Sequence, residues 1–283
     1  MIKYVFVILH YLTVEDTKEC VQSIIELCKE DDYHIVIVDN ASPNQTGKQL
    51  KTLYTGNDRI TVILNKENLG FARGNNVGFM CAKKRFKAEY IIVINNDTVI
   101  VQKDFCKNIE ECYRDTGFAV MGPMILSADG KFVSNPINEN NLDKNEVEKR
   151  IKFVKKRLFI FKCHLSRLVQ MCNKFRNANS DRDAARHLVQ KKNVRLHGSC
   201  LIFSSRYIEK FNGLDDRTFM YEEERFLQKR LQDNHLVSVY NPKTVIYHKE
   251  GSSTENSQKS GRKKQLFYLS NDLKSLNILL SDF

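Results

Sequence analysis

The strongest constraint on the fold is a regular alternation of short apolar runs with helical segments over the first hundred residues. The apolar runs are continuous and rich in Val and Ile, which is typical of strands covered on both faces. They lie at residues 4–9, 34–38, 60–64 and 90–94, and the helical segments at 17–28, 47–54 and 74–84. This order predicts an α/β fold with an open, doubly wound, mostly parallel sheet flanked by helices.

Polar side chains follow two of these predicted strands directly. Asp39 and Asn40 come after the second run, and Asn95, Asn96 and Asp97 come after the fourth. Ligands of doubly wound sheets bind beyond the carboxyl ends of the strands, so a site is expected there. A carboxylate in that place can hold a divalent cation against a diphosphate, although a strand-end Asp can equally cap the next helix.

A segment rich in Gly and Asn, residues 65–78, precedes a predicted helix. Gly70 leaves its backbone unhindered, a helix N-terminus suits phosphate, and Arg73 adds a positive charge. Asn68 and Asn76 add amide groups. The same composition is also common in turns and caps, so this segment alone leaves both interpretations open.

Three acidic residues, Glu222, Glu223 and Glu224, stand at the start of a predicted helix over 223–233. The helix dipole favours acids at this end without any catalytic role. Crowding by like charges also raises the pKa of a carboxylate, which suits a general base. His248 ends an apolar run at 244–247, and a lone histidine is more often a hydrogen-bonding residue than a ligand.

Taken together, these motifs resemble those of family 2 glycosyltransferases of GT-A fold, of the bacterial polysaccharide and rhamnosyltransferase-like type. Order and intervals match, and the resemblance covers residues 1–130 and 194–255. The motifs are Val38-Asp39-Asn40, the segment from Asn68 to Asn76, Asn95-Asn96-Asp97, Gly213-Leu214-Asp215 with Tyr221 to Glu224, and His248.

The resemblance implies a role for each motif. Asp39 would bind the nucleotide base, with Asn40, Asn68, Gly70, Arg73, Asn76, Asn95 and Asn96 around the donor. Asp97, assisted by His248, would bind Mg²⁺ or Mn²⁺, and Glu224, with Glu223 beside it, would be the catalytic base. Three positions depart from the family pattern: Asn95 replaces the first Asp of the DxD motif, Glu224 replaces Asp, and Leu12 replaces Asn.

The implied activity is inverting transfer of a hexose or deoxyhexose from a nucleotide diphosphate sugar, with UDP favoured over dTDP. The acceptor would be a hydroxyl of a glycan or a lipid-linked saccharide in cell-surface polysaccharide synthesis. Two other functions stay open: a weak or inactive nucleotide-sugar-binding homologue, which the missing carboxylate at Asn95 would explain, and a basic nucleic-acid-binding protein.

The positive charge is concentrated in one segment. The chain has a formal net charge of +11, and residues 138–195 hold sixteen Lys and Arg against six Asp and Glu. We therefore predict a donor-binding half at 1–130, a basic helical insertion at 138–193, and an acceptor and catalytic-base half with a C-terminal helix at 194–283. Aromatic residues in the insertion follow its apolar stripe rather than its charges, so nucleic acid is not the expected partner.

That apolar stripe, from Val147 to Phe175, has the three- and four-residue spacing of an amphipathic helix and needs a cover. The catalytic domain, a second copy of the chain and an anionic membrane are the three candidates. Lipid-linked acceptors and the aromatic residues Phe153, Phe159 and Phe161 among lysines favour the membrane over the dimer.

The cysteines and the N-terminal sequence indicate a location. Eight cysteines occur without a CxxC pair, which is typical of reduced thiols in a cytoplasmic protein. The N-terminal apolar run is too short for a signal peptide or a membrane span. We expect a cytoplasmic protein that works at the inner face of the cell membrane.

Overall fold

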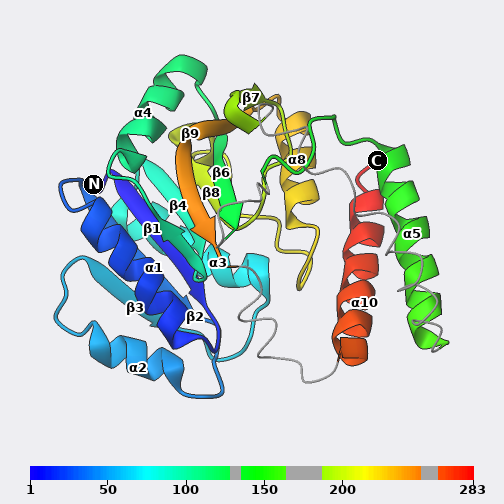
Figure 1. The fold of residues 1–283 in the computed structure, drawn as a ribbon, viewed down its shortest axis with the longest axis horizontal. Helices are drawn as coiled ribbons and strands as arrows, with labels where there is room; N and C mark the ends of the chain where they lie inside the picture. Colours follow the sequence, from blue (N-terminus) through cyan, green and yellow to red (C-terminus); the bar gives the residue numbers. More distant parts are fainter. Residues whose placement is uncertain (128–134, 164–186, 250–260) are drawn as a thin grey trace.

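The computed structural model describes residues 1–127, 135–163, 187–249 and 261–283, and its centre is a nine-stranded sheet (Figure 1). The strand order is β3-β2-β1-β4-β8-β6-β9-β5, with β7 paired to β9. The strands are β1 (Tyr4–His10), β2 (Tyr33–Asp39), β3 (Ile60–Leu64), β4 (Tyr90–Asn95), β5 (Thr98–Ile100), β6 (Val120–Ser127), β7 (Lys191–Lys192), β8 (Cys200–Phe203) and β9 (Ser238–His248).

The helices include the three expected in the first third of the chain. They are α1 (Val14–Leu27), α2 (Thr46–Leu53), α3 (Phe71–Cys81) continued by the π-helical turn η1 (Ala82–Phe86), α4 (Phe105–Thr116), α5 (Lys144–Lys162), α7 (Ser205–Ile208), α8 (Glu223–Asp233) and α10 (Gly261–Leu280). The short strand β5 and the helix α4 were not predicted. The apolar run at 244–247 is part of a longer strand, β9.

The sheet has a parallel half and a mixed half. β3, β2, β1 and β4 run parallel, while β8 is antiparallel to both β4 and β6. The chain reverses its direction of strand addition at β1, which has β2 on one side and β4 on the other. The carboxyl ends of these strands therefore flank a topological switch point, where ligands of such sheets bind. The predicted fold class is confirmed.

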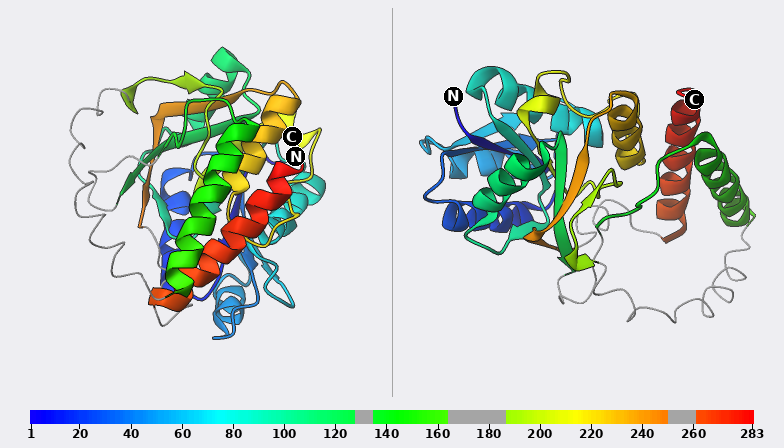
Figure 2. Two further views of the ribbon diagram at one scale, coloured as in Figure 1. Left: turned by 90° about the vertical axis from the view of Figure 1, so that its right-hand side faces the viewer. Right: turned by 90° about the horizontal axis from the view of Figure 1, so that it is seen from above.

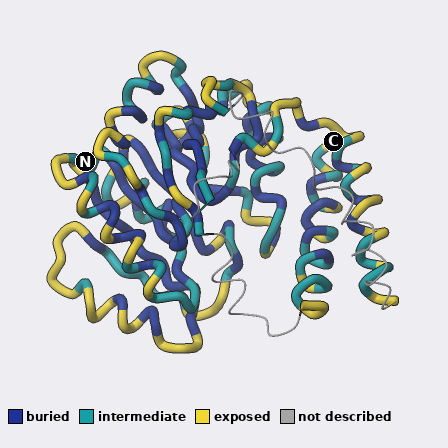
Figure 3. The backbone as a smooth tube through the Cα atoms, viewed as in Figure 1, coloured by how far each residue is buried: buried dark blue, intermediate teal, exposed yellow. Residues whose placement is uncertain are grey.

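Alternating residues of each strand enter two separate hydrophobic cores, which explains why the strand sequences are continuously apolar. Tyr4, Phe6 and Ile8 pack with α1 and α4 on one face of the sheet. Val5 and Val7 pack with α3, α7 and α8 on the other. Figure 3 shows the strands buried in the middle of this three-layer arrangement.

A third core lies outside these layers, between α5 and α10. These helices lie side by side in both views of Figure 2. Val147, Ile151 and Val154 of the apolar stripe are buried there, together with residues of α10 and Phe226 of α8. The described part of the stripe is thus covered by the chain itself, the first of the three candidate covers, and neither a membrane nor a second copy buries these residues. Leu165, Leu168, Cys172 and Phe175 lie outside the described residues.

The remaining expectations about the chain concern its thiols and the membrane. Cys20, Cys28, Cys106, Cys112 and Cys200 are buried, and no disulfide links the cysteines of the described ranges. Within those ranges, no helix has both the length and the apolar character needed to cross a bilayer.

Candidate active site

A cleft of about 510 Å³ opens at the carboxyl ends of the central strands. Nine of the twelve predicted site residues line it: Asn40, Asn68, Gly70, Asn95, Asn96, Asp97, Glu223, Glu224 and His248. The aromatic residues Phe219 and Tyr221 line it too. The sheet, the Gly-rich segment and the start of α8 thus converge on one site.

Asn40 organises the Gly- and Asn-rich segment. Its Nδ2 atom donates to Oδ1 of Asn68 at 2.9 Å and to the carbonyl of Gly70 at 3.1 Å, while its Oδ1 accepts from the Leu69 backbone at 3.0 Å. Gly70 has φ +83°, and a Cβ there would lie 2.0 Å from the carbonyl oxygen of Phe219. Only glycine fits this conformation so close to another backbone. The amides therefore shape this wall of the cleft.

Asp39 lies behind this wall and does not line the cleft. Both of its carboxylate oxygens accept from the Ser42 backbone at 3.3 Å, and a Cβ at Gly47 would lie 2.2 Å from the carboxyl group. Nε2 of His10 is 3.9 Å away. Burial lowers the pKa of His10 to about 4, so that imidazole is neutral near pH 7. The neutral ring of His10 is therefore not a cationic partner for Asp39.

Arg73 and Asn76 also lie outside the lining of the cleft. Nε of Arg73 donates to the carbonyl of Asp216 at 2.8 Å. Asn76 donates to the carbonyl of Leu214 at 2.9 Å and accepts from its N–H at 2.7 Å. Both residues of α3 thus hold the loop at 212–216, which leads to the acidic residues of α8.

Asp97 and His248 form the predicted cation-binding pair. Antiparallel pairing of β5 and β9 places Thr98 opposite His248, and Nε2 of His248 lies 3.2 Å from Oδ1 of Asp97. Two neighbouring ligands of an octahedral cation, each about 2.1 Å from it, are about 3 Å apart, so this spacing fits Mg²⁺ or Mn²⁺. Nδ1 of His248 is buried and has no hydrogen-bond partner among the described residues.

A second set of potential ligands lies elsewhere. Cys28, Asp31 and Cys106 have ligand atoms within 4.8 Å of one another. They stand near the amino ends of the strands, because Tyr4, the first residue of β1, contacts the carbonyl of Cys106. This set therefore lies at the opposite end of the strands from the cleft.

Glu223 and Glu224 enter the cleft from the first turn of α8. The two preceding residues, Tyr221 and Glu222, both have φ +72°, which turns the chain sharply into the helix. Oε1 of Glu224 accepts from the Gly198 backbone at 3.2 Å. Burial, and then repulsion by Glu224, raises the pKa of Glu223 to about 8. Glu223 is therefore protonated near neutral pH, and its buried Oε1 has no partner among the described residues.

Several cleft residues were missed by the sequence analysis. His197 stands with its ring 5.8 Å from that of His248, and its Nδ1 lies 3.0 Å from the Ser199 hydroxyl. Lys264 and Phe267 of α10 also line the cleft. Their three-residue spacing places both on one helix face, but no sequence signal joins that face to the sheet.

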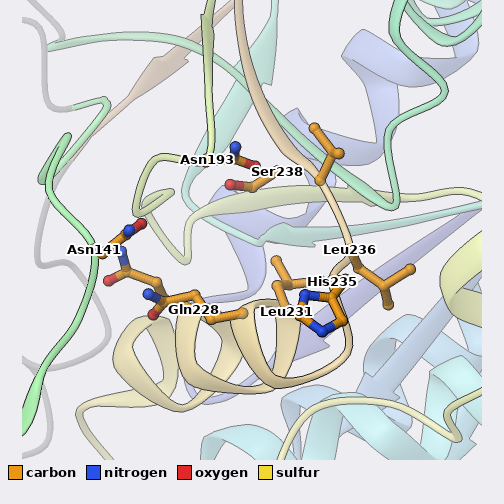
Figure 4. A pocket seen from close by; sticks show the side chains of 9 residues that line it. Asn141, Asn193, Gln228, Leu231, His235, Leu236 and Ser238 are labelled. Carbon is orange, nitrogen blue, oxygen red and sulfur yellow. The ribbon is translucent and has the colours of Figure 1, made fainter.

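A second cavity, of about 440 Å³, lies beside the C-terminal part of α8 (Figure 4). Asn141, Gln228 and His235 are among its lining residues. None of the predicted site residues lines it, and its lining includes no Asp, Glu, Lys or Arg. It offers neither a carboxylate for a metal nor a fixed cation for a diphosphate, so the larger cleft is the candidate active site.

Comparison with known proteins agrees with this geometry. The sequence model described as "Glycosyl transferase family 2" matches residues 6–199, from β1 to the residue before β8. The chain belongs to glycosyl transferase family 2. A relative in this comparison is the low-salt glycan biosynthesis hexosyltransferase Agl10 of Haloferax volcanii, which is 23% identical over 218 residues. That match covers 77% of this chain and 58% of the relative.

Two solved structures have a fold similar to that of this chain. S. aureus TarS 1–349 superposes with a TM-score of 0.54 at 14% identity, over 87% of this chain and 60% of that one. GalNAc-T7, solved with UDP, GalNAc and Mn²⁺, superposes with a TM-score of 0.58 at 11% identity, over 89% and 44%. The chain therefore spans less than two thirds of each of these relatives, and the likeness confirms the GT-A fold.

Proposed function

We propose that this chain is an inverting, metal-dependent glycosyltransferase that moves a hexose or deoxyhexose from a nucleotide diphosphate sugar to a hydroxyl of a glycan or lipid-linked saccharide. The observation that carries the proposal is that one cleft contains both the Asp97–His248 pair and the Glu223–Glu224 pair. The first pair suits a diphosphate with its cation, and the second suits the hydroxyl that attacks.

The donor half of the cleft would hold the leaving group. Asp97 and His248 would bind Mg²⁺ or Mn²⁺, which supplies positive charge to a diphosphate as it leaves. Asn40, Asn68, Gly70, Asn95 and Asn96 present amides and backbone groups beside them. Asp39 is assigned to the nucleotide base by the family resemblance. We assign Arg73 and Asn76 an indirect role, through the loop at 212–216 that they hold.

The acceptor half would supply the base. Glu224 takes the proton of the acceptor hydroxyl while that oxygen attacks the anomeric carbon, and the nucleoside diphosphate leaves from the opposite side. One displacement inverts the anomeric centre. The raised pKa of Glu223 keeps that side chain protonated near pH 7, so it is not available as a proton acceptor. This supports Glu224 as the base and Glu223 as its neutral neighbour.

The structure also bears on where the protein would work. The outer side of α5 exposes Lys152, Lys155 and Lys156 together with Phe153 and Phe159, which are 46% and 63% accessible. Basic and aromatic side chains on one exposed surface suit anionic lipid headgroups. We therefore propose a cytoplasmic protein whose α5 surface contacts the inner leaflet, close to lipid-linked acceptors of cell-surface polysaccharide synthesis.

A nucleotide-sugar panel tests the activity. The purified protein is incubated with UDP- and dTDP-linked hexoses and deoxyhexoses and Mg²⁺ or Mn²⁺, and released nucleotide and glycosylated products are measured by mass spectrometry. We expect turnover of one donor class, with UDP donors first. Nucleotide binding without turnover would instead favour an inactive homologue. A salt-dependent shift with bulk RNA and no turnover would favour nucleic-acid binding.

A further inference from the structure

The backbone that leads into the Glu223–Glu224 pair has an unusual conformation. Tyr221 and Glu222 are consecutive non-glycine residues in the left-handed region, each with φ +72°. Such residues are costly and persist only where their surroundings determine the conformation. The contacts of residues 220–222 are therefore the place to look for what aims the two carboxyl groups.

Glu222 points away from the cleft into a set of buried and partly buried charges. It does not line the cleft, and its carboxylate bonds to the guanidinium of Arg225. Its Oε1 lies 3.6 Å from Nε of Arg150, a residue of α5. Nη2 of Arg150 also donates to Oδ2 of Asp272, a fully buried residue of α10, at 2.8 Å. Arg150 thus bridges the strained turn to both helices of the hairpin.

The same charges continue along α5. Glu146, one turn before Arg150, accepts from Arg225 at 3.3 Å and pairs with the buried Arg195 at 2.8 Å. We call this group of three arginines and three acidic residues the α5 clamp: Glu146, Arg150, Arg195, Glu222, Arg225 and Asp272. A buried charge is stable only while its partners stay in place, so the clamp fixes the turn to α5.

The neighbouring residues are held from the same side. The ring of Tyr221 packs against that of Tyr268 of α10, with centroids 4.5 Å apart. The Ser275 hydroxyl donates to the carbonyl of Met220 at 3.0 Å. Residues 220, 221 and 222 are therefore each anchored to α5 or α10, while Met220 and Tyr221 still face the cleft.

We propose that Arg150 is a positioning residue, which acts through Glu222 to hold the left-handed turn that aims Glu223 and Glu224 at the acceptor. This inference rests on the proposed function. It also implies that the basic insertion helps to position the catalytic residues, since α5 supplies Arg150 and Glu146 to the clamp. A small displacement of a reacting group is expected to cost about 10- to 100-fold in rate.

Arg150→Met tests the proposal, with Lys149→Met as the matched control. Lys149 is the preceding residue of α5 and is exposed, so both variants remove one positive charge from the same turn. We expect Arg150→Met to lower kcat by about 10-fold or more and to leave the Kd of the free nucleotide within about 2-fold, with wild-type values for Lys149→Met. Arg150→Lys keeps the charge and should recover part of kcat.

Hydrogen exchange gives a readout that does not depend on activity. Amides at 220–224 should exchange faster in Arg150→Met than in the wild type or Lys149→Met. If Arg150→Met does not fold, Arg150→Met/Asp272→Asn leaves no buried carboxyl group without its guanidinium partner at this contact and should show the same effects. Wild-type kcat and wild-type exchange in a folded Arg150 variant would overturn the clamp. A wild-type protein inactive on every donor would overturn the proposed function, while the exchange experiment would still decide the clamp.

Discussion

Nε2 of His248 lies 3.2 Å from Oδ1 of Asp97, although the two residues come from opposite halves of the chain. Pairing of β5 with β9 brings them together, in a cleft that also holds Glu223 and Glu224. Asn95 cannot supply the charge of a second carboxylate from β4. The imidazole of His248 would thus be a second ligand for the proposed cation at Asp97.

Transfer should therefore depend on a divalent cation. We expect EDTA to abolish turnover and Mn²⁺ or Mg²⁺ to restore it, and His248→Ala to need a higher metal concentration for half-maximal activity. Nucleotide affinity measured by calorimetry should rise with metal in the wild type and be nearly independent of metal in Asp97→Asn. Full turnover in excess EDTA would show that the diphosphate is neutralised by the protein alone.

Glu224 and Glu223 are adjacent, and variants of each test our assignment of the catalytic base to Glu224. Glu224→Gln should lower kcat by about 10² or more, because the acceptor hydroxyl loses its proton acceptor, while donor affinity is retained. Glu223→Gln should have the smaller effect, since a protonated carboxyl and an amide are both neutral. Steady-state kinetics with both variants give the comparison. A larger loss in Glu223→Gln would reverse the roles.

The raised pKa of Glu223 should also make the free energy of unfolding depend on pH. Its pKa is raised from 4.5 to about 8, so between these values the folded state binds more protons at this site than the unfolded state. The free energy of unfolding is therefore expected to fall as pH rises from about 4.5 to 8. Asp272, whose pKa is raised to about 7 by burial and by Glu222, acts in the same direction.

Denaturant unfolding of wild type and Glu223→Gln between pH 5 and pH 8 measures this effect. The wild type should lose stability across the range, and the variant should lose less because its amide does not titrate. Asp272 titrates in both proteins, so its contribution to the pH dependence is the same in both and cancels in the comparison. Parallel curves for the two proteins would mean that Glu223 is already ionised in the folded state.

Strand and helix positions in the first third of the chain were predictable because each element shows the hydrophobic pattern typical of its secondary structure. The two faces of β1 enter separate cores, so Tyr4 to Ile8 had to be continuously apolar. β5 has only three residues, too few for a period to be recognised. It is nevertheless the strand that brings Asp97 to His248.

Site residues were predictable where their position at the end of a strand brings them to the cleft. They were not predictable where the side chain contacts a different helix or loop. Asn95 ends the buried strand β4, Asn96 and Asp97 follow it, and all three line the cleft as expected. Arg73 and Asn76 belong to the right motif, yet their side chains bond to the loop at 212–216. Lys264 depends on how α10 packs against α5, which a charge pattern does not specify. The choice among the three candidate covers of the apolar stripe stayed open for the same reason.

Asp39 is a sharper test of the family resemblance, because it lies behind the cleft wall. Asp39→Asn keeps the size of the side chain and removes its charge beside the neutral His10. We expect weaker binding of the free nucleotide, with kcat changed much less, since the proposed contact is remote from the anomeric carbon. Calorimetry with UDP checks this. Unchanged affinity would assign Asp39 to the Ser42 turn alone.

The α5 surface should bind anionic vesicles. Lys152, Lys155, Lys156 and Lys162 are exposed, and each basic residue near such a surface contributes about 1 kcal/mol. Changing all four to Glu should abolish co-sedimentation with vesicles of anionic lipid at low salt. The matched control changes four exposed lysines of the catalytic domain to Glu, namely Lys48, Lys51, Lys84 and Lys87.

This comparison separates the surface from the overall charge, because both variants change the net charge by the same amount. The wild type and the control should sediment with anionic vesicles, less so at high salt because exposed charges are screened, and neither should sediment with neutral vesicles. Phe153→Ser/Phe159→Ser should weaken the binding that remains at high salt. Equal sedimentation of the α5 variant and the wild type would remove the membrane role, and would leave α5 its contacts with α10 and the clamp.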